Sequence, residues 1–223
     1  MWTTTMFLAL ARIAAAPVVA LAATAPAGSG WTLLALALFS VVSLIDLFDL
    51  AFLRRNAARP AYCVLVERTG DRVMVITTLA VVIGMSASYR GAGTGALAEV
   101  PAVAVALPAL VIVIREILVS GLREHLGAAN LPITPLARTK AALQLIAVFL
   151  LLLVHALPAL EIVFSRGTGG IPPHLFLTAD PPYQDELVIA GLACLWLATA
   201  VTVWSAIDYF RKGWPQVFAD PAE

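Results

Sequence analysis

The strongest constraint in the sequence is a series of long apolar stretches that contain almost no charged residues. A helix needs about 20 predominantly apolar residues to cross a membrane. Six stretches meet this requirement, some with polar residues near one end, at 10–27, 31–53, 71–89, 100–122, 139–160 and 187–209. The pattern predicts an all-α, polytopic membrane protein with six transmembrane helices, in which residues 1–223 form a single domain. Residues 1–11 are expected to form a short interfacial helix before the first span.

The composition excludes other classes of protein. Charged residues make up only 13% of the chain, whereas a soluble domain has about 25%. The formal net charge is zero, so we expect no nucleic-acid partner, which would require a basic surface. A secretory signal around residues 13–25 is disfavoured because no positive charge precedes Arg12. Two isolated cysteines, Cys63 and Cys194, indicate neither a disulfide framework nor a zinc site.

Basic residues gather on one side of the predicted spans. They lie in or beside the second and fourth linkers and in the C-terminal tail, at Arg54, Arg55, Arg59, Arg68, Arg72, Arg123, Arg138, Lys140, Arg211 and Lys212. The opposite side has only Arg90 and Arg166. Because basic loops stay in the cytoplasm, we expect both termini to be cytoplasmic and the Gly- and Pro-rich segment 161–186 to form an external loop.

Two aromatic residues and one histidine have expected places in this arrangement. Trp31 and Tyr209 lie near the ends of spans, where interfacial aromatic side chains are common. His155 lies near the outer end of the fifth span. We expect this single histidine to be a hydrogen-bonded packing group rather than a metal ligand.

Four carboxylates lie where the second span ends and the third begins, on the predicted cytoplasmic side. Asp46 and Asp49 are three residues apart, and Glu67 and Asp71 are four apart, so each pair shares one face of a helix. Four unpaired anions converging there would repel one another, and burying them is costly. A hard divalent cation with oxygen ligands resolves this conflict. A pair of such ions is a common device for holding phosphate oxygens during displacement at phosphorus.

Spacing alone leaves a simpler interpretation open. The four acids could pair with the five arginines of the second linker as a solvated interfacial cluster. An ion or proton transporter is a further alternative, because acids inside spans are usually functional. Transport would require polar residues across both halves of the spans, and the outer halves contain few.

The segment from Asp46 to Asp71 resembles the signature of the CDP-alcohol phosphatidyltransferases, D-x-x-D-G-x-x-A-R-x8-G-x3-D-x3-D, and keeps its spacing throughout. Four positions retain the family residue, namely Asp46, Asp49, Arg54 and Asp71. Four positions differ, with Leu50 and Cys63 in place of glycines, Leu53 in place of alanine and Glu67 in place of aspartate. The motif is therefore degenerate in residue type but intact in spacing.

Further segments extend the resemblance over about residues 5–157. Residues 8–13 are similar to the N-terminal L-T-x-x-R segment of the family. Residues 115–124 (REILVSGLRE) closely resemble the R-E-x-x-x-S-x-L-R-E run of bacterial phosphatidylglycerophosphate synthases, and residues 138–144 resemble their K-x-K-T-x-x-Q segment. The chain is identified as a member of the family, most similar to these synthases.

The resemblance implies a reaction and a set of roles. In the family, acidic residues bind two divalent ions, Mg²⁺ or Mn²⁺, which hold the diphosphate of a CDP-linked lipid. By this resemblance the metal ligands are Asp46, Asp49, Glu67 and Asp71. Asp71 is also the general base that removes the proton of the acceptor alcohol, which attacks the β-phosphorus and releases CMP. The donor site comprises Arg54, Leu50 and Cys63.

For such a synthase the donor is CDP-diacylglycerol and the acceptor is glycerol 3-phosphate, a small dianion that needs a basic pocket. The candidates for this pocket are Arg115, Arg123, Arg138 and Lys140. Arg123, Arg138 and Lys140 could instead anchor or end helices at the interface. A pair between Arg115 and its neighbour Glu116 is disfavoured, because adjacent helical residues do not face each other. The resemblance also implies a homodimer in a bacterial-type inner membrane, with its active site on the cytoplasmic side and a role in phospholipid biosynthesis.

The departures from the signature concern the donor site. Leu50 adds an isobutyl group where glycine permits close approach of the nucleotide, Leu53 enlarges a packed contact, and Glu67 reaches one methylene further than aspartate. Two alternatives therefore remain beside the synthase. One is the same chemistry with another acceptor, such as inositol phosphate or serine, and the other is an inactive homologue that serves as a membrane binding or scaffold protein. The retained acids and Arg54 favour an active enzyme.

Overall fold

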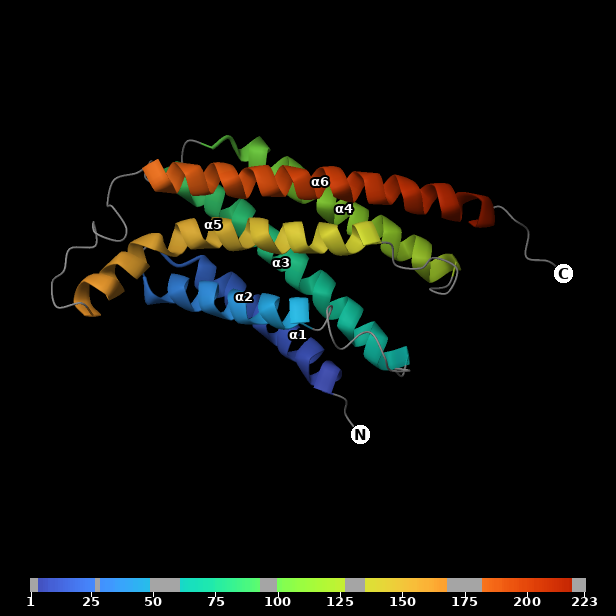
Figure 1. The fold of residues 1–223 in the computed structure, drawn as a ribbon, viewed down its shortest axis with the longest axis horizontal. Helices are drawn as coiled ribbons and strands as arrows, with labels where there is room; N and C mark the ends of the chain where they lie inside the picture. The colour runs from blue at the N-terminus through green and yellow to red at the C-terminus, as the bar shows by residue number, and fades with distance from the viewer. Residues whose placement is uncertain are drawn as a thin grey trace.

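The computed structural model describes residues 4–26, 29–48, 61–92, 100–126, 135–167 and 182–217. All regular elements within these ranges are helices, in the order α1 Thr4–Ala23, α2 Gly30–Phe48, α3 Ala61–Ala92, α4 Ala102–Leu126, α5 Pro135–Gly167 and α6 Pro182–Val217. The helices form an elongated bundle in which α3 crosses behind the others at an angle (Figure 1). The prediction of an all-α fold is confirmed for the described residues.

The helices carry the apolar segments expected of a membrane protein. Within the described residues, three segments are long and apolar enough to cross a membrane, namely Ala102–Leu122, Thr139–Leu160 and Asp185–Arg211. The first three helices contain shorter apolar segments, at Leu10–Ala23, Gly30–Ile45 and Arg72–Gly84. All six coincide in position with the predicted spans. The bundle is therefore that of a membrane protein, while six complete crossings stay a prediction.

The N-terminal region differs from the sequence-based expectation. The expected separate interfacial helix is wrong, because α1 runs without interruption from Thr4 to Ala23. The helix is not interrupted because α1 contains neither glycine nor proline before Pro17. The first residues of α1 thus extend the first apolar segment instead of forming an element of their own.

Contacts between helices show their relative directions. The Trp196 indole Nε1 on α6 donates to the carbonyl of Ala104 on α4 at 3.1 Å, and further along both helices Arg115 of α4 contacts Ser205 of α6. Residue numbers rise together along the two helices, so α4 and α6 are parallel. Parallel packing of the fourth and sixth helices agrees with a chain that reverses direction at each connection.

His155 connects α5 to the end of α1. Its ring Nε2 lies 3.2 Å from the carbonyl oxygen of Ala25, and its side chain is buried. The expectation of a hydrogen-bonded packing group is confirmed. The contact also shows that α5 approaches the end of the bundle at which α1 terminates.

The larger apolar core of the described residues joins all six helices. Each helix contributes at least one fully buried residue, as illustrated by Val19, Phe39, Leu79, Ile112, Leu151 and Leu195. The helices approach closely where Gly191 of α6 faces α5, because a Cβ atom added there would lie 3.1 Å from Leu151 Cγ. Small residues at such points let membrane helices pack tightly.

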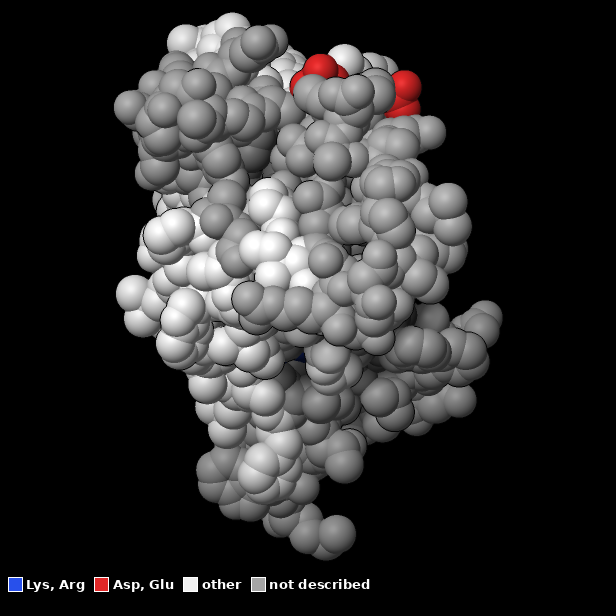
Figure 2. All heavy atoms as spheres, turned by 90° about the vertical axis from the view of Figure 1, so that its left-hand side faces the viewer, with Lys and Arg blue, Asp and Glu red and all other residues white. Residues whose placement is uncertain are grey.

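The outer surface of the bundle is also strongly apolar. Large side chains such as Leu21, Trp31, Val103, Ile117 and Trp204 are exposed, as expected of surfaces that face lipid. Figure 2 views the end of the molecule at which α6 begins, where the described surface is mostly uncharged apart from acidic groups at its upper edge. Exposed acids in this part of α6 are Asp185 and Glu186. The buried charged side chains of the described spans are Arg12 of α1, Arg115 of α4 and Lys140 of α5.

Candidate active site

Arg115 is a buried arginine on α4 whose guanidinium has partners on three sides. Nη2 donates to Ser205 Oγ on α6 at 2.7 Å, and Nη1 donates to Glu116 Oε1 at 3.2 Å. The guanidinium carbon lies 5.5 Å from the centroid of the Tyr209 ring, which is within the range of a cation–π contact. Because a buried charge without partners is costly, these contacts define one favoured position for the side chain.

Glu116 joins this arginine to the next helix. The Nζ atom of Lys140, near the start of α5, donates to the same Oε1 atom that accepts from Arg115. Lys140 is buried, and the Glu116 carboxylate is 17% exposed. One carboxylate oxygen therefore holds two cations from different helices, and we name the group formed by Arg115, Glu116, Lys140, Ser205 and Tyr209 the basic cluster.

The structure corrects one expectation about this cluster. The disfavoured pair between adjacent residues does form, because the long side chains of Arg115 and Glu116 bend toward each other although their Cβ atoms point in different directions. Tyr209 is buried and packs against Val119, so its ring faces the interior of the bundle, while its interfacial depth stays a prediction. The Tyr209 ring lies beside the guanidinium of Arg115.

The basic cluster has more positive than negative charge. Among the described side chains, Arg115 and Lys140 share the single carboxylate of Glu116, which leaves one positive charge in excess. Arg72 of α3 lies close enough for its charge to act on Lys140. In a buried layer with little water, an excess of positive charge favours the binding of an anion.

The same layer contains hydrogen-bond donors that no acceptor in the described part of the chain satisfies. Gln144 is buried one turn beyond Lys140 on α5, and its Nε2 has no hydrogen-bond partner there. The Nε atom of Arg115 is likewise buried without a partner among the described residues. A buried donor that lacks an acceptor costs about 1–3 kcal/mol. The site therefore has both the charge and the free N–H groups that a phosphorylated ligand uses.

Sequence reasoning found only part of this cluster. Arg115 and Lys140 were predicted, and the structure brings them together through Glu116. The roles of Glu116, Ser205 and Tyr209 were missed, as was the unpaired amide of Gln144. A possible signal was the i, i+4 spacing of Ser205 and Tyr209, which places both polar groups on one face of an otherwise apolar helix.

The other predicted residues are placed only in part. Backbone positions within helices are known for Asp46, Cys63, Glu67, Asp71, Arg123 and Arg138, whose side chains lie outside the described set. Four further residues fall entirely outside the described ranges, namely Asp49, Leu50, Leu53 and Arg54. Among the side chains that the structure describes, no three His, Cys, Asp or Glu residues are grouped as a metal site. The side chains of the four predicted metal ligands are not among those described.

The backbone nevertheless relates the predicted acids to the basic cluster. Asp71 directly precedes Arg72, whose charge acts on Lys140. Asp46 lies in the last turn of α2, which ends at Phe48. The acidic positions of α3 and the basic residues of α4 and α5 therefore belong to one region of the bundle.

Sequence comparisons relate the chain to known proteins. A sequence model of CDP-alcohol phosphatidyltransferases matches residues 2–204. A CDP-diacylglycerol–glycerol-3-phosphate 3-phosphatidyltransferase of Cereibacter sphaeroides is 29% identical over 193 residues, 81% of each chain. A protein of the same name from Rickettsia bellii is 28% identical over 207 residues, 92% of each chain.

A plant relative is similar over a shorter region. A cardiolipin synthase (CMP-forming) of Oryza sativa subsp. japonica is 27% identical over 114 residues, 48% of this chain and 28% of its own. The family match, in contrast, includes five of the helices completely and much of α6. On the strength of that match, the chain belongs to the CDP-alcohol phosphatidyltransferase family of enzymes.

Proposed function

We propose that the protein transfers the phosphatidyl group of CDP-diacylglycerol to glycerol 3-phosphate, which yields phosphatidylglycerol phosphate and CMP. The names of the Cereibacter and Rickettsia relatives support this acceptor. The observation that carries the proposal is the buried excess of positive charge in the basic cluster. An acceptor alcohol without a phosphate or another anionic group would leave that charge uncompensated.

In this proposal, Arg115 and Lys140 bind the phosphate of the acceptor. The guanidinium offers N–H groups in a rigid plane, and the lysine adds a compact positive charge. Glu116 and Ser205 hold these cations in place without contacting the acceptor. The side chains of Arg123 and Arg138 are proposed to complete the basic pocket.

The reacting groups are proposed to be those of the signature motif. Asp71 accepts the proton of the acceptor hydroxyl, and Arg54 contacts the nucleotide of the donor beside Leu50 and Cys63. The hydroxyl oxygen then forms a bond to the β-phosphorus, and the bond to the departing CMP breaks. Asp71 directly precedes Arg72 on α3, and the charge of Arg72 acts on Lys140, which supports a base near the proposed acceptor pocket.

The acidic positions fit a hard divalent ion by the chemistry of their donors. Asp46, Asp49, Glu67 and Asp71 offer only carboxylate oxygens, which suit Mg²⁺ or Mn²⁺ and not zinc. Two bound ions would neutralise the diphosphate of the donor and polarise its phosphorus. We assign these four residues to hold them.

The proposed location follows from the distribution of charge. We place the basic cluster and the signature motif at the cytoplasmic side of a bacterial-type inner membrane, with both termini in the cytoplasm, because the basic linkers lie at that end of the spans. A homodimer is proposed from the family alone.

The reaction can be tested with purified protein in detergent. We expect CMP release from CDP-diacylglycerol to require glycerol 3-phosphate and either Mg²⁺ or Mn²⁺, and to stop when a chelator is added. Asp71→Asn should abolish turnover. Glycerol, serine and inositol phosphate serve as competing acceptors, and faster turnover with any of them than with glycerol 3-phosphate would contradict the proposed acceptor.

A second set of variants tests the phosphate pocket. Lys140→Met should raise the KM for glycerol 3-phosphate by about tenfold or more, which corresponds to about 1.4 kcal/mol of lost binding, and should leave the KM for the donor unchanged. Glu186→Gln is the control, because Glu186 is exposed at the opposite end of α6. An unchanged acceptor KM in Lys140→Met would rule out the proposed pocket.

A further inference from the structure

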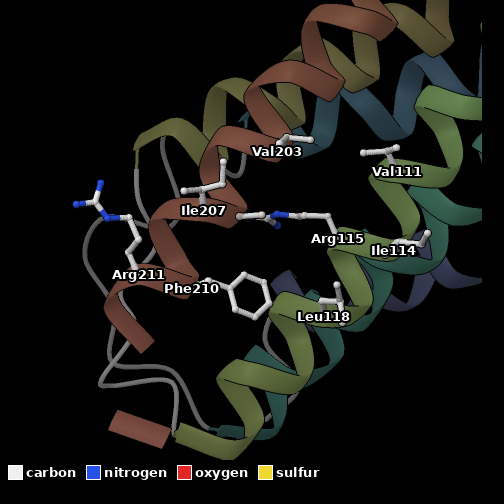
Figure 3. A pocket seen from close by; sticks show the side chains of 9 residues that line it. Val111, Ile114, Arg115, Leu118, Val203, Ile207, Phe210 and Arg211 are labelled. Carbon is white, nitrogen blue, oxygen red and sulfur yellow. The ribbon is translucent and has the colours of Figure 1, made fainter. Parts of the chain in front are cut away.

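An apolar groove of about 390 Å³ lies between α4 and α6. Its walls are formed by Ile114 and Leu118 of α4 and by Val203 and Ile207 of α6 (Figure 3). A volume of this size falls within the range of small-ligand sites, about 300–1,000 Å³. The groove is therefore large enough to hold part of a ligand and apolar enough to favour hydrocarbon over water.

The groove opens toward the lipid-facing surface of the bundle. Ile114 is 47% exposed, Leu118 51%, Val203 41% and Ile207 53%. These side chains belong to the apolar segments Ala102–Leu122 and Asp185–Arg211. The medium that reaches the groove is consequently the acyl region of the membrane.

One end of the groove carries a positive charge. Arg211 contributes to its lining, is exposed, and extends away from the bundle beyond Ile207 (Figure 3). It is the last residue of the apolar segment Asp185–Arg211, so it lies at the depth where apolar sequence gives way to polar sequence. Basic pockets between transmembrane helices at this depth bind anionic lipid headgroups.

The other arginine of the groove serves a different purpose. Arg115 crosses from α4 toward α6 and lines the groove with its aliphatic stem (Figure 3). Its guanidinium is held by Ser205 and Glu116. Because the proposed reaction assigns that guanidinium to the acceptor phosphate, the charge for a ligand in the groove comes from Arg211.

We infer that the groove binds one acyl chain of an anionic phospholipid from the surrounding bilayer, with the lipid phosphate on Arg211. The proposed metal ligands lie on α2, on α3 and in their linker, whereas the walls of the groove belong to α4 and α6. The inference concerns a resident lipid, so it does not depend on which acceptor the enzyme uses.

Lipid retention by purified protein tests the inference. The protein is loaded with phosphatidylglycerol or with phosphatidylcholine of the same acyl chains, washed in detergent, and analysed by native mass spectrometry. We expect tighter retention of phosphatidylglycerol by about fivefold, the contribution of one basic residue near an anionic headgroup. Arg211→Gln should remove this preference, and Arg211→Lys should keep it.

A matched pair of variants tests the groove itself. Val203→Trp fills it and should reduce retention by about tenfold or more, since each displaced methylene accounts for about a fourfold factor in affinity. Leu197→Trp adds the same side chain at a lipid-facing position of α6 outside the groove and should retain lipid as the unmodified protein does. Circular dichroism of both variants checks that each is folded.

Three results would overturn the inference. The first is equal retention of the two lipids, and the second is equal loss in Val203→Trp and Leu197→Trp. The third is stoichiometric displacement of phosphatidylglycerol by CDP-diacylglycerol in the presence of a chelator, which would assign the groove to the donor. Failure of the proposed reaction would leave these binding results unchanged, so the two proposals fail separately.

Discussion

Replacing Ser205 with alanine isolates one contact of the basic cluster. The Ser205 hydroxyl accepts a hydrogen bond of 2.7 Å from Nη2 of Arg115, and both side chains are buried. The substitution removes this acceptor, creates little empty space, and leaves a charged N–H group without a partner. The variant therefore weakens the support for Arg115 without changing the charge of the site.

The expected magnitude follows from the chemistry of the bond. A hydrogen bond to a charged group contributes about 1.5–3 kcal/mol, so the free energy of unfolding should fall by about that amount in Ser205→Ala. Loss of the fixed arginine position should also raise the KM for glycerol 3-phosphate by about tenfold, equivalent to about 1.4 kcal/mol. The KM for CDP-diacylglycerol should stay the same, because Ser205 acts only through Arg115.

The structure provides a closely matched control on the same helix. Thr202 is also fully buried on α6, but its hydroxyl has no hydrogen-bond partner within the described ranges. Thr202→Val keeps the shape of the side chain and should leave both KM values and the unfolding free energy unchanged, or raise the latter slightly. Equal effects of Ser205→Ala and Thr202→Val in steady-state kinetics and detergent unfolding would refute the role of the Ser205 contact.

Three further predictions concern other contacts in the bundle. Glu116→Gln should lower the free energy of unfolding by about 3–5 kcal/mol, since it breaks a buried ion pair. Urea or detergent titration would measure this change. A loss below about 1 kcal/mol, on the order of a surface pair, would contradict the prediction. Gly191→Ile should destabilise the contact between α5 and α6, because even a Cβ atom added at Gly191 would lie 3.1 Å from Leu151. Gly84→Ala adds a Cβ atom that meets no atom within 4 Å and should be neutral or stabilising by up to about 1 kcal/mol. The order of the two thermal midpoints is the readout. Gln144→Leu should raise the acceptor KM without lowering stability, because the amide that it removes has an unpaired donor; a lower thermal midpoint with an unchanged KM would disprove a role in binding.

The arrangement of spans was predictable because a single physical effect governs it. Burial of apolar side chains in lipid sets where helices lie, and the predicted segments 100–122 and 139–160 differ from Ala102–Leu122 and Thr139–Leu160 by two residues or fewer at either end. The same reasoning failed at the N-terminus. Polarity alone could not show that α1 continues from Thr4 without a break, since this depends on backbone continuity rather than on hydropathy.

The basic cluster was harder to predict because its contacts join residues far apart in sequence. Arg115 and Ser205 are separated by 90 positions, and Glu116 and Lys140 by 24. The sequence indicated which cations were unusual for a membrane helix. Which partners neutralise them depends on how α4, α5 and α6 rotate against one another, and no residue pattern within one helix specifies that rotation.

The contact between Arg115 and Glu116 has a consequence for how the protein is made. Both residues of this contact belong to α4, so the contact forms within a single helix. Synthesis begins at the N-terminus, so α4 reaches the translocon before Lys140 and Ser205 have left the ribosome. A lone arginine in the middle of an inserting helix is disfavoured by about 2.5–3.5 kcal/mol. Because Glu116 neutralises Arg115 within the same helix, α4 can enter the bilayer without an unpaired positive charge before α5 and α6 are synthesised.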